Sequence, residues 1–86
     1  MQGVEQIIVQ CKSKNRQAQK KLFETFGPML YAVSRRYTPS NFDPMDNLHD
    51  AFLKIYEKIH LFDPTKGSFE AWSVKIVINC GLNKCE

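Results

Sequence analysis

The chain has 86 residues, of which 43% are hydrophobic and 24% are charged, and its formal net charge is +3. A chain of this length forms one domain with a small core, and this composition excludes an intrinsically disordered tail. No apolar run approaches the roughly 18 residues that a membrane-spanning helix needs, and the amino terminus lacks the features of a secretion signal. We therefore expect a cytoplasmic protein with a single domain over residues 1–86.

The charges are distributed unevenly along the chain. Residues 1–42 carry seven lysines and arginines against two glutamates, whereas residues 43–63 carry two lysines against five acidic residues. A basic region and an acidic segment indicate two different partners. Solvated helix surfaces without any partner would show the same distribution.

The cysteines indicate neither a disulfide framework nor a zinc site. Cys11, Cys80 and Cys85 are an odd number and include no C-x-x-C pair. We expect them to be buried, reduced thiols.

Two helices are predicted in the first half of the chain. Val4, Ile7, Ile8 and Cys11 recur at the spacing of one helical face and predict a short amphipathic helix near residues 3–13. Asn15 is a suitable N-cap for a second helix over residues 16–37. The apolar face of this second helix consists of Leu22, Phe26, Met29, Leu30, Val33 and Tyr37.

Two further helices are predicted in the second half. Asp43 and Pro44 form an N-cap followed by a first-turn proline, which predicts a third helix over residues 44–60. Ser68 is the candidate N-cap of a fourth helix over residues 68–84. The run VKIVI in that segment would also suit a buried strand, but three helices offer it no pairing partner.

The predicted fold is therefore all-α, a compact bundle of four helices. We expect its core to include Phe26, Leu30, Phe52, Ile55 and Ile76.

Residues for catalysis are scarce. His49 and His60 lie on one predicted helix about 16 Å apart, which is too far to share a metal ion or a substrate atom. No H-E-x-x-H motif, nucleophile elbow or phosphate-binding loop is present in the sequence. The sequence predicts a protein that is not an enzyme and that uses no cofactor and no metal.

The third predicted helix has an outward face of acidic character. Once its regularly spaced apolar residues are assigned to the core, Asp46, Asp50, Leu53 and Glu57 align outward, with His49 beside them. An exposed leucine among acidic residues is a candidate contact site for a protein partner. The alternative is an ordinary solvated face with one exposed leucine.

The segment FDPTKGSFEAW, residues 62–72, joins the third and fourth predicted helices. It breaks the chain twice, yet Phe62, Phe69 and Trp72 surround the break. These rings either bury the loop against the core or shape a surface that receives a flat group such as a base.

One face of the fourth predicted helix lies next to this loop. Trp72, Lys75, Asn79 and Leu82 align on it. A ring can stack on a base, an amide can bond to the edge of a base, and a lysine can meet a phosphate, so this face is a candidate nucleic-acid contact. A single tryptophan at helical spacing can equally belong to the core.

The run DNLHDAFLKIYEKIHLFDPTKGSFEAWSVKIVIN closely resembles region 2 of the extracytoplasmic-function (ECF) sigma factors, the promoter-specificity subunits of bacterial RNA polymerase. The family pattern is roughly D-L-V-Q-E-x-F-L-K-x-Y, a short loop with a glycine, and F-x-x-W-L-x-R-I-A-x-N. Upstream, KKLFETFGPMLYAVSRRY is similar to the preceding segments of the family. The resemblance covers almost the whole chain, and it depends on the joint order and spacing of these pieces.

The resemblance implies a polymerase-binding site and a DNA-binding site. Asp46, His49, Asp50 and Leu53 match the helix that docks on the clamp helices of the largest polymerase subunit, and Glu57 continues the same face. The residues that match the site for a flipped non-template base of the minus-ten element are Asp63, Thr65, Lys66, Gly67, Ser68, Lys75 and Asn79. Trp72 matches a family tryptophan, for which a DNA-facing role and a packing role are both open.

Three positions depart from the family pattern. Asn47 stands where a leucine or isoleucine is usual, His49 where glutamine is usual, and Lys75 where arginine is common. Lysine lacks the planar guanidinium fork of arginine. The chain also shows no second domain for the minus-thirty-five element, so we expect one domain of a longer or truncated factor.

Two functions are therefore expected from different classes. The first is a promoter-specificity module that docks on core polymerase and melts the minus-ten element. The second is a helical interaction domain that binds polymerase or an anti-sigma factor without reading DNA.

Overall fold

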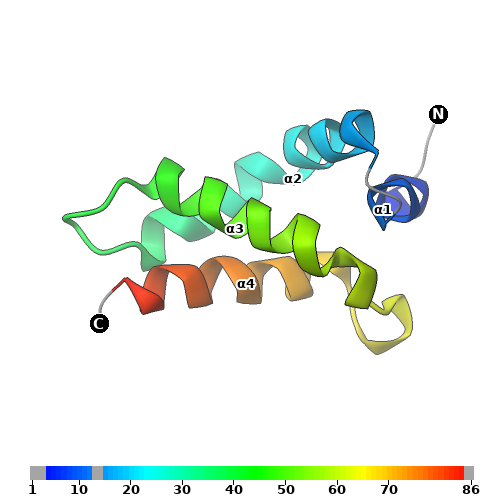
Figure 1. Cartoon of the computed structure of the whole chain (residues 1–86). Helices are drawn as coiled ribbons and strands as arrows, with labels where there is room; N and C mark the ends of the chain where they lie inside the picture. Colours follow the sequence, from blue (N-terminus) through cyan, green and yellow to red (C-terminus); the bar gives the residue numbers. More distant parts are fainter. Residues whose placement is uncertain (1–3, 13–14, 85–86) are drawn as a thin grey trace.

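The computed structural model describes residues 4–12 and 15–84. Within these ranges the chain is helical, with no strand (Figure 1). The elements in chain order are α1 (Val4–Lys12), α2 (Arg16–Tyr37), α3 (Pro44–Lys58), η1 (Ile59–Leu61), η2 (Pro64–Lys66) and α4 (Phe69–Asn83), where η marks a short 3-10 turn. The prediction of an all-α bundle with four helices is confirmed for the described residues. Residues 3 and 13, the predicted ends of the first helix, lie outside them.

Three long helices form the body of the molecule. α2, α3 and α4 pack pairwise against one another, and α1 lies across one end, against α2 and η1 (Figure 1). The turn between α2 and α3 is at the opposite end from the segment that joins α3 to α4. In the described ranges, no helix has both the length and the apolarity that a membrane crossing requires.

Side-chain caps fix the starts of three helices at the positions that the sequence predicts. Asn15, Asp43 and Ser68 each accept a hydrogen bond from a backbone amide two or three residues ahead, at 3.1, 2.9 and 3.1 Å. Each bond satisfies an amide that the helix itself leaves unpaired. α3 ends at Lys58 rather than at residue 60, because the chain tightens there into η1.

The core lies between the three long helices. Phe26, Leu30, Phe52 and Ile55 are buried as predicted. The prediction for Ile76 is wrong, because this side chain is only half-buried at the edge of the core. The run VKIVI offers an apolar side chain in nearly every direction, so its pattern does not tell which side of α4 faces inward. The buried positions of α4 are Phe69, Ser73, Val77, Cys80 and Gly81.

Two of the three cysteines lie in the described residues. Cys11 and Cys80 are buried free thiols, which confirms the prediction for this pair. Burial raises the pKa of the Cys11 thiol, because the thiolate would lose its hydration. Cys85 lies outside the described residues.

α4 approaches the end of α2 closely at a glycine. A Cβ atom added at Gly81 would overlap the backbone carbonyl of Tyr37. At Gly27, in the middle of α2, an added Cβ would instead lie 3.6 Å from the Phe23 ring, an ordinary contact. Of these two helical glycines, only Gly81 is required by the packing.

We expect Gly81→Ala to lower the free energy of unfolding by about 1–3 kcal/mol, because the added methyl group must push two helices apart. Gly27→Ala is the matched control. It should raise the free energy of unfolding by about 0.5–1 kcal/mol, since alanine favours the helix more than glycine does. Urea unfolding followed by circular dichroism measures both, and a stabilising Gly81→Ala would contradict the close approach.

Candidate functional site

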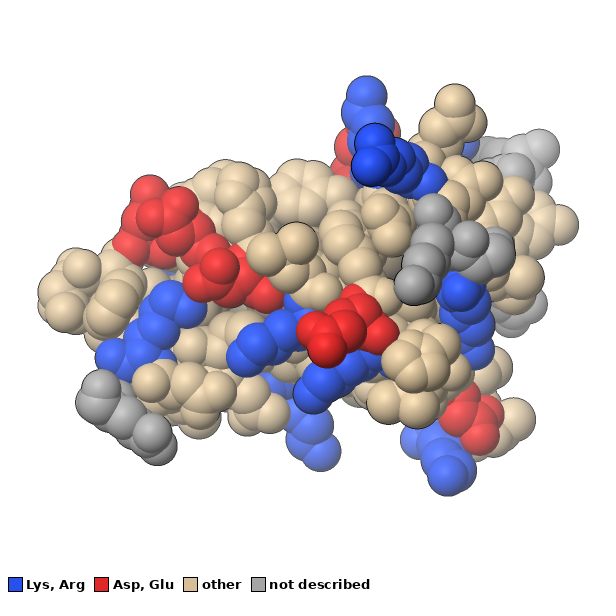
Figure 2. All heavy atoms as spheres, in the orientation of Figure 1, with Lys and Arg blue, Asp and Glu red and all other residues tan. Residues whose placement is uncertain are grey.

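α3 presents the residues of its predicted contact site on one exposed surface. Asp46, His49, Asp50, Leu53 and Glu57 are all exposed, and we call these five residues the acidic face. Leu53 is 67% exposed, so its apolar surface is available to a partner. Figure 2 shows acidic side chains spread over the side of the molecule that carries α3, with basic side chains among them. The face is therefore negative at several points without being uniformly negative.

Aromatic rings from α2 and α3 support this face from behind. The ring of His49 lies 5.9 Å from that of Phe23, and Phe23 lies 4.7 Å from the buried ring of Phe52, measured between centroids. His49 thus rests against a packed cluster while it remains exposed to solvent.

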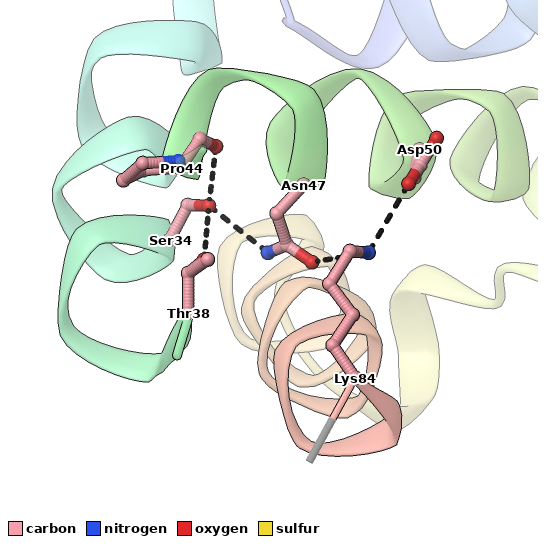
Figure 3. Close-up of polar contacts among 6 residues, drawn as sticks. All are labelled: Ser34, Thr38, Pro44, Asn47, Asp50 and Lys84. Atoms are coloured by element: carbon pink, nitrogen blue, oxygen red, sulfur yellow. Dashed lines mark hydrogen bonds and ion pairs between the residues drawn. The ribbon is translucent and has the colours of Figure 1, made fainter. Parts of the chain in front are cut away.

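A buried polar network fixes α3 between its two neighbours (Figure 3). The side chain of Asn47 is fully buried, and its Nδ2 donates to Ser34 Oγ on α2 at 2.9 Å. Ser34 Oγ in turn donates to the backbone carbonyl of Pro44 at 2.7 Å and lies 3.2 Å from the Thr38 hydroxyl. On the other side, Lys84 Nζ donates to Asn47 Oδ1 at 3.0 Å. All polar atoms of the buried amide are therefore tied to α2 or to the end of α4.

The same lysine reaches the acidic face. Lys84 Nζ also donates to Asp50 Oδ2 at 3.1 Å, and the two groups form an ion pair. The side chain of Lys84 is 19% exposed and that of Asp50 is 55% exposed. One carboxylate of the acidic face is thus paired within the chain.

A shallow groove runs beside this ion pair, between α3 and α4. It has a volume of about 340 Å³. Its lining consists of Asp50, Leu53, Lys54, Glu57, Cys80, Asn83 and Lys84. Three residues of the acidic face therefore share one concave surface with the carboxyl end of α4.

The loop between α3 and α4 is held in a defined turn. Asp63 Oδ1 accepts hydrogen bonds from the Thr65 amide at 2.9 Å and from the Thr65 hydroxyl at 2.7 Å. These two bonds stabilise the ionised carboxylate and lower the pKa of Asp63. Lys12 Nζ, from α1, donates to the Phe62 carbonyl at 2.8 Å and fixes the start of the loop.

Gly67 is needed for the backbone of this loop. Its φ is 153° and its ψ is 175°, a region that is essentially restricted to glycine. An added Cβ would meet no atom within 4 Å, so the requirement is conformational and not steric crowding.

Aromatic rings anchor both ends of the loop. Phe62 and Phe69 are buried and meet edge to face, with centroids 5.6 Å apart. Phe69 also contacts Phe26 of α2 at 4.8 Å. Trp72 is half-buried and contacts both Phe62 and Phe69, at 5.4 and 5.6 Å. The two phenylalanines are core residues, whereas the indole is a core contact on part of its surface and accessible on the rest.

The accessible part of Trp72 lines an open cavity of about 390 Å³ at the loop. Its other lining residues are Leu61, Phe62, Asp63, Lys66, Gly67, Ser68, Ala71 and Lys75. The cavity has an aromatic wall, a carboxylate and two ammonium groups. This combination can hold a flat, polar group next to an anionic backbone.

Most residues of the predicted DNA site meet at this cavity. Thr65 and Asn79 do not line it. Thr65 instead forms the turn with Asp63, and Asn79 is exposed on α4 one turn beyond Lys75.

Three lining residues, Leu61, Phe62 and Ala71, are not among the predicted site residues, and Phe62 is predicted only to surround the loop. The spacing of Ala71, Lys75 and Asn79 by four residues places them on one side of a helix, and this signal was present in the sequence. Leu61 lies in a 3-10 turn, which an α-helical pattern does not describe.

We expect acidification to release the turn that shapes the cavity. The ionised Asp63 makes the bonds to Thr65, so their contribution is present above the unfolded pKa of about 3.9. It is lost as the pH falls through the lower folded pKa of Asp63. Hydrogen exchange of the Thr65 amide, followed by NMR, should show this loss in the parent chain. An Asp63→Asn variant should lack this pH dependence, and an equal dependence in both chains would contradict the assignment.

A family model described as sigma-70 region 2 matches residues 22–85. No match was found among the curated proteins. Sigma-70 region 2 is a helical transcription-factor domain without enzymatic activity that serves promoter recognition and polymerase binding. The match covers about three quarters of the chain, and the structure is an all-α bundle as this family requires. The chain therefore belongs to the sigma-70 region 2 family.

Proposed function

We propose that this domain docks on core RNA polymerase through the acidic face and binds the non-template strand of a minus-ten element at the loop cavity. Its role would be to capture an unpaired base and so favour promoter melting, as an ECF-type sigma factor does in the bacterial cytoplasm. The cavity of about 390 Å³ beside Trp72 is the observation that carries this proposal.

The size and lining of the cavity suit a single base. Its volume falls within the roughly 300–1,000 Å³ that is typical of small-ligand sites. Trp72 offers an accessible aromatic surface, and stacking of a base on such a ring contributes about 1–3 kcal/mol. Lys66 and Lys75 supply cations for the phosphates on either side of the base. The cavity is open to solvent, so a base already extruded from the duplex can enter it.

Asp63 gives the cavity a means of discriminating between bases. Both hydrogen bonds to Thr65 use Oδ1, which leaves Oδ2 to accept from a ligand. A carboxylate accepts from an exocyclic amino group such as N4 of cytosine. We therefore propose a preference for a base that carries an amino group at its edge. Asn79, one turn further along α4, would contact the next nucleotide.

The acidic face suits a basic, helical surface such as the polymerase clamp helices. Leu53 offers apolar contact at the centre, and the surrounding carboxylates can pair with cations of the partner. An anti-sigma factor that covers the same face would compete with polymerase.

One observation favours the second candidate function, an interaction domain that reads no DNA. The family resemblance implies that the amide of Asn79 contacts a base, but Asn79 lies outside the cavity lining. In that case the acidic face would bind polymerase or an anti-sigma factor, and the cavity would show no preference between strands.

We expect Leu53→Asp to abolish binding to core polymerase, because a charge would replace the central apolar contact. Leu61→Asp is the matched control, since Leu61 is 68% exposed but belongs to the loop cavity. A pull-down with core polymerase in the absence of DNA should capture the control as well as the parent chain.

Charge reversal by Asp50→Lys should weaken docking by more than the ~0.2–1 kcal/mol of an exposed ion pair. Undiminished capture of Leu53→Asp would remove the docking proposal.

For DNA, we expect affinity and sequence preference to separate between residues. Lys75→Ala should weaken all single strands alike and reduce the slope of log affinity against log salt by roughly 0.7, the value for one lost phosphate contact. Asp63→Asn and Asn79→Ala should instead reduce the preference between cognate and scrambled strands, with little change in that slope.

Fluorescence anisotropy at two salt concentrations distinguishes these effects. Double-stranded promoter should bind far more weakly than the single strand, because base extrusion costs a few kcal/mol and the isolated domain has no polymerase to offset it. Equal affinity of the parent chain for cognate and scrambled single strands would favour the interaction-only function.

A further inference from the structure

Lys84, at the carboxyl end of α4, contacts the acidic face through its ammonium group (Figure 3). It follows the last residue of α4 and reaches across to α3, where it bonds to Asn47 Oδ1 and Asp50 Oδ2. The side chain is mostly buried along this path, so the ammonium is held at a fixed place.

The orientation of Asn47 decides what holds the ammonium. Its amide nitrogen donates to Ser34 Oγ, so its oxygen points to Lys84. The flipped amide would set an NH2 group against an ammonium, two donors with no acceptor between them. The network therefore requires the amide oxygen to face α4, and it anchors Lys84 independently of Asp50.

This anchoring has a consequence for Asp50. Asp50 is 55% exposed and can turn toward solvent, whereas the Lys84 side chain is 19% exposed and has Asn47 Oδ1 as a second acceptor for its ammonium. A cation of a docking partner that approaches Asp50 must then share the carboxylate with Lys84 and lie close to a like charge. The usual leucine or isoleucine in place of Asn47 would offer the ammonium no such anchor.

We propose that Lys84, held by Asn47, is an internal counter-ion that weakens docking at the acidic face by competing with the partner's cation for Asp50. This inference rests on the proposed docking to polymerase. Asn47, which stands where the family pattern usually has leucine or isoleucine, would then help to set the affinity of the domain for its partner.

The test measures the affinity of the full chain for core RNA polymerase at low salt. Lys84→Met should tighten binding about 1.5- to 5-fold, the range expected for one exposed ion pair. The gain should shrink as ionic strength rises, because salt screens exposed charges. Lys58→Met removes an equal charge from α3 without touching Asp50 and is the matched control. It should not produce this gain.

Two further variants separate competition from a structural effect. In an Asp50→Asn background, Lys84→Met should no longer tighten binding, because the contested carboxylate is gone. Asn47→Leu keeps the lysine but removes its anchor, and it should also tighten binding. The double variant Asn47→Leu/Lys84→Met leaves no unpaired buried amide, so it keeps the test valid if Lys84→Met alone unfolds. Thermal unfolding of each chain gives the folded fraction.

The outcomes distinguish this inference from the docking proposal. If the parent binds polymerase and neither Lys84→Met nor the double variant binds more tightly, the counter-ion role is wrong and docking stands. A gain of the same size in the Asp50→Asn background would also overturn it, because the effect would then be one of net charge. If the parent does not bind polymerase, the docking proposal fails and this inference fails with it.

Discussion

A single buried amide constrains how the three long helices fit together. Asn47 is fully enclosed, and an amide without partners in such a place would cost about 1–3 kcal/mol. It avoids that cost only when α2 supplies Ser34 on one side and Lys84 approaches on the other. Among the described residues, no buried side-chain polar atom lacks a partner, so the requirement is fully met. The rotation of α3 that satisfies the amide is also the rotation that turns the acidic face outward.

The loop at the other end of α3 is anchored in the core at both ends and borders the open cavity between them. Phe62 and Phe69 are buried in the core, and this fixes the points where the loop leaves α3 and enters α4. Between them, the Asp63 turn and the unusual backbone of Gly67 hold the chain away from the core. The result is a hydrogen-bonded rim around an open cavity, with Trp72 shared between core and cavity. The sequence left two interpretations of the rings around the loop, burial against the core or a surface for a flat group. The two phenylalanines bury the ends of the loop, and part of the indole stays accessible.

α1 adds a support that the family match does not include, because the match begins at residue 22. Its Lys12 bonds to the Phe62 carbonyl, at the start of the loop. The short first helix therefore contributes to the position of the cavity although it lines none of it.

Much of the fold could be predicted from the sequence, because its signals are local. Asn15, Asp43 and Ser68 are caps at helix starts. The regular apolar spacing of α2 and α3 identifies most of their buried positions, but Tyr37, predicted on the apolar face of α2, is 40% exposed. α4 gave no such signal, since VKIVI is apolar on nearly all sides, and Ile76 was placed too deep in the core.

The candidate site shows the same division between local and distant information. The exposure of the acidic face and the cavity-lining loop residues followed from spacing and from the family resemblance. The sequence marked Asn47 as unusual, but it could not show what the amide binds. Ser34 and Lys84 are 13 and 37 residues away along the chain, and only the packed helices bring them together.

The central claim is that an unpaired promoter base enters the cavity beside Trp72, which is the single tryptophan of the chain and hence a specific fluorescent reporter. The most direct measurement is the change in tryptophan fluorescence on titration with a cognate single strand and with the same strand made abasic at one position at a time. The account predicts quenching by the intact strand and loss of that quenching at one particular abasic position, with the phosphates unchanged. Equal quenching by the intact strand and by every abasic strand would contradict it.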